Sequence, residues 1–189
     1  MEKQIFVTNS VLEDRPYMDP GTYGRQDAGD VEGVGTLRWV GSKLYRWVQN
    51  RAAAALAAGD VVYHNCSNLA DAEKWVSGGL AADLGFMAGV VASTKIDVGT
   101  TAPAVDYSDG GYGWIQVVGY NAAVAILPNG TTDMAAGHVC IGADATKAIV
   151  WGAALNTSPK HKKNIMLLEA CASMQTPVAT TKKCWISCL

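Results

Sequence analysis

Charge is scarce in this sequence of 189 residues. Charged side chains make up 17% of it, where roughly 25% is usual for a soluble domain. The 15 Lys and Arg residues nearly balance the 17 Asp and Glu residues, for a formal net charge of −2. This balance gives no reason to expect nucleic acid or an anionic membrane as a partner. Low charge favours a chain that covers part of its surface with other chains, although a compact monomer with a glycine-rich β core fits the composition as well.

Long apolar runs are also missing. No segment approaches the ~20 apolar residues that cross a bilayer, and the opening "MEKQIFVTNS" carries Glu2 and no apolar stretch. We therefore expect neither a membrane span nor a secretory leader. The five cysteines are odd in number and irregularly spaced, which favours reduced thiols in a cytosolic setting over a disulfide framework.

Metal-ligand patterns are weak. His64 and Cys66 stand two residues apart on a predicted strand, and so do His138 and Cys140. Residues at that spacing share one face of a strand. Neither pair has a clear third ligand, and the sequence has no Cys-x-x-Cys pattern. We therefore expect no metal and no cofactor.

Motifs that carry a catalytic nucleophile or bind phosphate are absent. The sequence has no Gly-x-Ser-x-Gly, no His-Glu-x-x-His and no phosphate-binding Gly-x-x-x-x-Gly-Lys. Asp97, Asp106 and Asp109 fall around one loop, and two carboxylates can act as an acid/base pair. Acidic loops of this kind are more often simply solvated. We expect no enzyme and no catalytic residue.

The first segment, residues 1–34, is predicted to be an extended arm. It mixes prolines, glycines and acids without a periodic apolar face, so it cannot form a core by itself. It carries Phe6, Tyr17, Met18 and Tyr23, which are unusual in a freely solvated tail. A disordered tail remains an alternative, but an arm that orders against a neighbouring subunit accounts better for these side chains.

Residues 35–158 are predicted to form the body. Thr36–Val40 and Lys43–Asn50 flank Gly41-Ser42, and a two-residue loop that starts with glycine is typical of a β-hairpin. Trp39 and Trp47 supply aromatic pairing across its strands.

Further strands are predicted along the body. "DVVYHN", "GFMAGVVAST", "GGYGWIQVVGY", "NAAVAIL", "HVCIGA" and "KAIVWGAAL" are short apolar runs between turn signals, with a turn expected at Tyr120-Asn121. One short helix is expected at Asp71–Val76. This spacing predicts an all-β fold, a small β-barrel or jelly-roll-like sandwich. Residues 159–189 are predicted to be a tail that packs on the body or a neighbour through Trp185.

One pattern occurs twice. "LAAGDVVYHN" at Leu56–Asn65 and "MAAGHVCIGA" at Met134–Ala143 each place Ala-Ala-Gly before a predicted strand. Chance recurrence is possible in an alanine-rich chain. We interpret the two copies as equivalent corners of one barrel, each a tight glycine turn that leads into a strand.

These segments together resemble a protein family. The order "KLYRWVQN", "ALAAGDVVYHN", "GVVAS", "YGWIQVVGYNAAVAI" and "MAAGHVCIGADATKAIVWGAAL" is similar to accessory head proteins of tailed bacteriophages, above all capsid cement or decoration proteins. The resemblance covers roughly residues 35–155 and leaves the arm and the cysteine-rich tail unexplained. It implies a virion structural protein with a small β body, assembled in the host cytoplasm. Such a protein commonly forms a homotrimer on the outer surface of the capsid, bound to the major capsid protein, with no catalytic residue, no required cofactor, no specific nucleic acid and no membrane among its expected partners.

Interface residues are expected in all three segments, mostly among the aromatic side chains. The candidates are Phe6, Tyr17, Tyr23, Trp39, Trp47, Trp114, Gln116 and Trp185. The alternative is a carbohydrate- or receptor-binding module of a phage tail or head fibre, in which Trp39, Trp47 and Trp114 stack on sugar rings.

Overall fold

The protein is all-β in the part that its computed structural model describes, which confirms the predicted fold class. The described residues are 32, 34–50, 54–64, 75–78, 87–93, 95–96, 111–128, 130–142, 148–151, 164–176 and 178–188. The strands are β1 (Leu37–Val40), β2 (Lys43–Asn50), β3 (Leu56–Ala57), β4 (Val61–His64), β5 (Trp75–Ser77), β6 (Met87–Val91), β7 (Lys95–Ile96), β8 (Gly111–Ile126), β9 (Val139–Gly142), β10 (Ile149–Trp151), β11 (Asn164–Leu167) and β12 (Thr180–Ser187). These residues include no helix that could span a bilayer.

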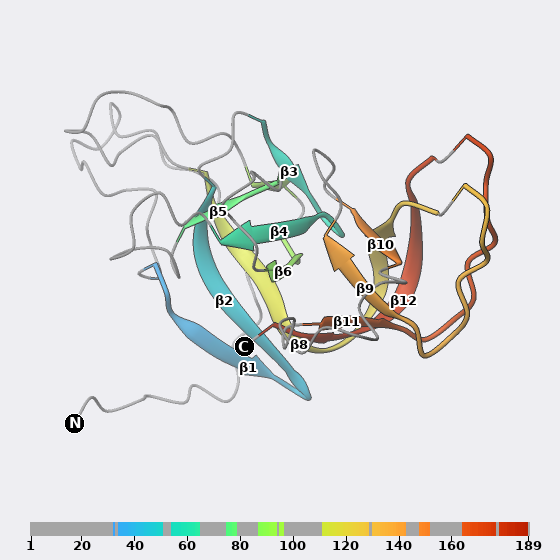
Figure 1. The fold of residues 1–189 in the computed structure, drawn as a ribbon. Helices are drawn as coiled ribbons and strands as arrows, with labels where there is room; N and C mark the ends of the chain where they lie inside the picture. Colours follow the sequence, from blue (N-terminus) through green and yellow to red (C-terminus); the bar gives the residue numbers. More distant parts are fainter. Residues whose placement is uncertain are drawn as a thin grey trace.

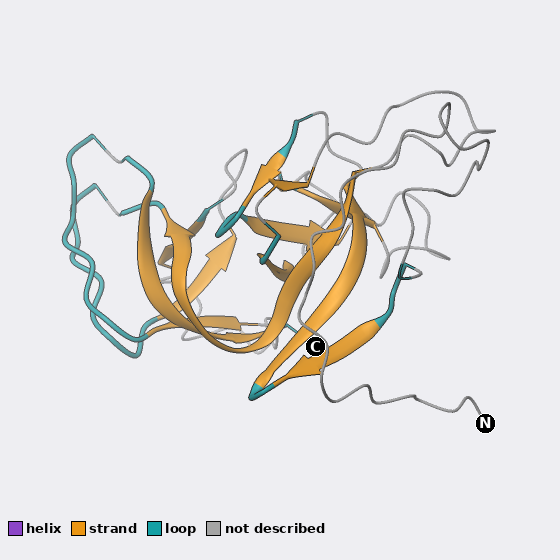
Figure 2. Ribbon diagram, turned by 180° about the vertical axis from the view of Figure 1, so that it is seen from behind, coloured by secondary structure: helices purple, strands orange, loops and turns teal. Residues whose placement is uncertain are grey.

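Strand pairing closes two rings of five strands. The first barrel runs β2-β5-β4-β6-β8 and returns to β2, and the second runs β8-β10-β9-β11-β12 and returns to β8. Strand β8 therefore belongs to both rings, and the ribbon shows it passing from the green and blue strands to the orange and red ones (Figure 1). From behind, the two groups of strands lie side by side (Figure 2). The predicted small β-barrel is in fact two fused barrels.

Strand β8 bends where a turn was predicted. Its first half pairs with β2 and its second half with β12, so the chain continues through Tyr120-Asn121 without reversing. Gly119 has φ +105, and a Cβ there would lie 2.8 Å from the Ser42 carbonyl oxygen. The Asn121 side chain accepts a hydrogen bond from the Ala123 amide. Glycine and asparagine here mark a bend between barrels, and the predicted turn is wrong.

The predicted β1–β2 hairpin is confirmed. Leu37 to Val40 pair antiparallel with Arg46 to Lys43, and Gly41 in the loop has φ +59. A positive φ is accessible to glycine at little steric cost, which explains why this loop can be two residues long.

The two Ala-Ala-Gly copies form the same turn. The amide of Asp60 donates to the Ala57 carbonyl, as that of His138 does to Ala135. The Asp60 and His138 side chains also accept from the amides of Ala57 and Ala135. The glycines have φ +87 at Gly59 and +89 at Gly137. The predicted equivalence is confirmed, but the corners belong to two barrels instead of one.

Pairing repeats from one barrel to the other. After the turn, Val61 lies opposite Val90, which lies opposite Gln116, which lies opposite Tyr45. In the second barrel the corresponding row is Val139, Met166, Trp185 and Tyr120. Strand β5 is parallel to β2 as β10 is parallel to β8. The chain is therefore an internal duplication in which β8 closes the first unit and opens the second.

Each barrel has its own apolar interior, and the two interiors differ in chemistry. The first holds aliphatic side chains such as Val62, Val91 and Ile115. The second adds sulfur, from Met134, Cys140, Cys171, Cys184 and Cys188. Val61 and Val90 alternate with Val62 and Val91, so their side chains face outward from the first barrel. They belong instead to the apolar cluster of the second barrel. One outer face of the first barrel thus packs on the second barrel.

Two boundaries from the sequence need correction. Trp75 and Val76, placed at the end of a predicted helix, lie in β5 between β2 and β4; residues 71–74 lie outside the described part. Strands β11 and β12, placed in a tail beyond residue 158, belong to the second ring, so the body extends to Ser187. The predicted arm lies outside the described residues except for Glu32 and Val34.

Candidate interaction surface

Large apolar side chains remain exposed at several places on the described surface. They are Leu37, Trp39, Val40, Val139, Met166, Leu168, Met174, Val178 and Trp185. Scattered single residues of this type are ordinary, whereas neighbours that form a continuous patch indicate a contact surface. Two groups of neighbours occur here, one on the second barrel and one on β1.

The group on the second barrel is a row across three adjacent strands. Val139 on β9 lies opposite Met166 on β11, which lies opposite Trp185 on β12. Their exposed fractions are 37%, 36% and 44%. The residues that alternate with them, such as Cys140, Ile165 and Ile186, fill the barrel interior, so the row lies on the outer wall. We name Val139, Met166 and Trp185 the exposed wall.

One pair of charges near the exposed wall, Lys183 and Glu169, forms within the chain. Lys183 Nζ lies 3.4 Å from Glu169 Oε2, and the Lys183 amide donates to the Glu169 carboxylate. The pair is solvated and contributes little stability. The hydrogen bond from the Lys183 amide is the first cause that holds the Glu169 pKa below its usual value, so the carboxylate stays ionised beside its lysine. The rim of the wall therefore carries no net charge from this pair.

The second exposed group is the edge of β1. Leu37, Trp39 and Val40 are exposed, and among the described strands β1 pairs with β2 alone. A strand with one open edge and apolar side chains can add a strand from another chain. Trp39 was predicted as an interface residue, and it is available at the surface.

Trp47 and Trp114, both predicted as interface residues, are buried, at 3% and 1% exposure. Their rings meet edge to face at 5.2 Å, and Tyr112 stacks on Trp47. Arg38 covers Trp114 with its guanidinium 4.9 Å from the ring centroid. The two tryptophans pack β2 against β8, which corrects their predicted role at an interface.

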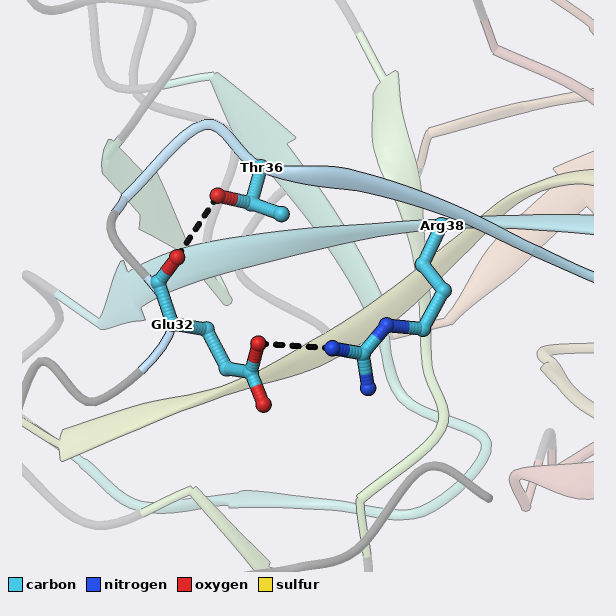
Figure 3. A network of polar contacts seen from close by, with 3 residues as sticks. All are labelled: Glu32, Thr36 and Arg38. Atoms are coloured by element: carbon cyan, nitrogen blue, oxygen red, sulfur yellow. Dashed lines mark hydrogen bonds and ion pairs between the residues drawn. The ribbon is translucent and has the colours of Figure 1, made fainter. Parts of the chain in front are cut away.

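Arg38 is held in place from the start of the described chain. Its guanidinium forms a 2.7 Å ion pair with Glu32, and the Thr36 hydroxyl donates to the Glu32 carbonyl (Figure 3). Both charged side chains are largely shielded, at 15% and 18% exposure. The contact closes the chain over Trp114, whose Nε1 is buried without a hydrogen-bond partner in the described structure.

Gln116 is likewise buried, at 1% exposure. Its amide nitrogen donates to the carbonyls of Val118 and Tyr120, and its amide oxygen accepts from Asn121. These bonds satisfy the side chain and stabilise the bend of β8. Its predicted role at an interface is therefore corrected to a structural one.

Trp185 is exposed as its predicted role requires, and lies at one end of the exposed wall, beside Met166. The other wall residues, Met166 and Val139, were missed, because only the register of β9, β11 and β12 brings the three into one row. The alternation of polar and apolar residues in "TTKKCWIS" was the available signal. Phe6, Tyr17 and Tyr23 lie outside the described residues, as do the acidic loop Asp97, Asp106 and Asp109 and Cys66.

The thiols of the second barrel are poorly suited to chemistry. Burial raises the pKa of Cys140 and of Cys184 to about 12, with a smaller contribution from neighbouring thiols. Only a thiolate acts as nucleophile or metal ligand, so these groups stay neutral and unreactive near pH 7. His138 lies in the turn before β9 with Nδ1 accepting from the Ala135 amide, while Cys140 points into the core. Among the described residues no group of histidine, cysteine and carboxylate side chains could hold a metal ion.

No family model matches the sequence, and no curated protein matches it either.

Proposed function

We propose that this chain is a structural protein of a tailed-phage head, a capsid decoration protein that binds the outer surface and stabilises the lattice. It acts without catalysis or a cofactor. Copies associate, as a homotrimer in the simplest case, and contact the major capsid protein. The sequence resemblance over the body suggests this role.

The observation that carries the proposal is the exposed wall on a rigid double barrel. Closed five-stranded rings with apolar interiors are stiff, and stiffness suits a protein that must resist deformation of a shell. The exposed apolar side chains are not needed to fill either interior, so they are available for other chains. Low charge over the sequence, 17% of residues, points the same way.

The alternative, a carbohydrate- or receptor-binding module, has one observation in its favour. Trp39 is exposed on β1 and could stack on a sugar ring. The other two tryptophans considered for stacking, Trp47 and Trp114, are buried, which weakens this proposal. A glycan array hit that is lost in Trp39→Ala would favour it.

The proposal is tested by adding the purified full chain to phage heads that lack it. We expect the chain to sediment with the heads at a fixed ratio to the major capsid protein and to raise the temperature at which they release DNA. A variant without residues 1–30 should remain folded and bind with lower occupancy, because the predicted arm adds contact area. Absence of co-sedimentation for the full chain would reject the capsid role.

A further inference from the structure

Because the chain is an internal duplication, the exposed wall of the second barrel can be compared with the equivalent face of the first barrel. In the first barrel the row equivalent to the wall is Val61, Val90 and Gln116, reached by the same register from the same turn. Their exposed fractions are 0%, 0% and 1%. The same wall is therefore covered in one unit and open in the other.

The cover of the first wall comes from the second unit. Val61 and Val90 share one buried cluster with Ile126, Ile149 and other side chains of the second barrel. Each unit therefore offers, on the outside of β4 and β6 or of β9 and β11, a face that can be buried by the unit that follows. Among the described residues, no further unit follows the second one to cover its wall.

The turn glycines show the same difference. A Cβ on Gly59 would lie 2.5 Å from the Ala123 carbonyl oxygen, and the Gly59 carbonyl accepts from the Ala125 amide, so β8 lies directly on this turn. At Gly137, with the same backbone conformation, no atom of the described residues other than its chain neighbours lies within 4 Å of the equivalent position. Two separate features of the second unit are thus open where the first unit is covered.

We propose that the exposed wall of the second barrel docks a second copy of this chain, which covers Val139, Met166 and Trp185 as the second unit covers Val61 and Val90. The partner is another copy because the chain already contains one contact of this kind between its own units. The rim suits self-association, since Lys183 and Glu169 neutralise each other within one copy. The inference rests on the self-association in the proposed function and names the surface that carries it.

A contact from the wall of one copy to a different face of the next is head to tail. Such contacts form a closed ring when the rotation between copies closes, and an open filament when it does not. A ring of three copies corresponds to the homotrimer proposed above. Trp185 is the aromatic side chain of the wall, and tryptophan is enriched among the residues whose loss costs most at an interface.

The test is the mass of the full chain in solution, measured by sedimentation over a range of micromolar concentrations. Trp185→Lys and Met166→Lys each place a charge on the wall, at outward positions that the barrel interior does not use. Val178→Lys, at a residue 60% exposed and away from the wall, is the matched control. Circular dichroism checks that all variants keep their strands.

We expect the wild type and Val178→Lys to form oligomers, and both wall variants to dissociate at least ~30-fold more readily, as when a strong interface anchor is lost. A monomeric wild type, or two wall variants with unchanged mass, would overturn the proposal. So would wall variants that keep their mass but no longer bind heads, because the wall would then contact the capsid protein. Oligomers that depend on the wall but ignore heads would support this proposal and reject the capsid role.

Discussion

At the scale of single residues, similar side chains have different tasks because register places them differently. Trp114 and Trp185 both lie on strands of closed rings, yet one is 1% and the other 44% exposed. Trp114 lies under Arg38 and against Trp47, whereas Trp185 lies between Met166 and Tyr120 on an open wall. Residue type alone therefore overestimated the set of contact residues.

The buried thiols are expected to make the folded chain less stable as the pH becomes alkaline. The pKa of Cys140 and of Cys184 rises from the ordinary 9.0 to about 12 on burial. Below pH 9 both thiols are neutral in the folded and unfolded chain, and above it only the unfolded chain ionises, so stability falls as pH rises from about 9 to about 12. Each thiol contributes up to ~1.4 kcal/mol per pH unit in that window.

We expect urea unfolding to show this loss. Between a pH just below 9 and one unit above it, the wild type should lose about 2 kcal/mol more than a Cys140→Ala/Cys184→Ala variant. The comparison removes the contribution of lysines and tyrosines, which titrate in both proteins. Equal losses in the two proteins would show that these thiols are accessible to solvent in the fold.

At the scale of elements, each unit is built from one turn and the strands that it aligns. Gly59 and Gly137 adopt the same left-handed conformation, but only Gly59 has another strand against it. A comparison of the same substitution at Gly59 and Gly137 therefore separates the cost of backbone strain from the cost of a steric clash with β8.

Alanine at each glycine should measure the two effects. Gly137→Ala should cost about 1 kcal/mol, from the positive φ alone. Gly59→Ala should cost a further ~1–3 kcal/mol, because the Ala123 carbonyl must move. Chemical denaturation of the two variants gives both values. Equal costs would mean that β8 does not lie on the first turn as described.

The elements that were predicted correctly are those with local signals. The β1–β2 hairpin has a glycine loop, and β4 and β9 follow the repeated turn. The elements that were missed depend on distant partners. Trp75 and Val76 join β5 because β2 and β4 pair with them, which overrides their helical pattern. Strand β12 joins the second ring by pairing with β8, some sixty residues earlier in the chain.

At the scale of the whole molecule, one strand joins two barrels that repeat the same pairing. The exposed wall is visible only at this scale, because Val139, Met166 and Trp185 come from three strands and its covered counterpart comes from the other unit. The sequence contained one trace of the duplication, the repeated Ala-Ala-Gly, since turns keep their glycines while the strand residues diverge. Ring closure involves pairs too far apart in the chain for any local pattern to predict.

The most direct test of the account is a cryo-electron microscopy reconstruction of a phage head that carries this protein. The account predicts density for the double barrel on the outer surface of the head, with neighbouring copies in contact through Val139, Met166 and Trp185. Density confined to the tail or a fibre, or isolated copies on the head with this wall facing solvent, would contradict it.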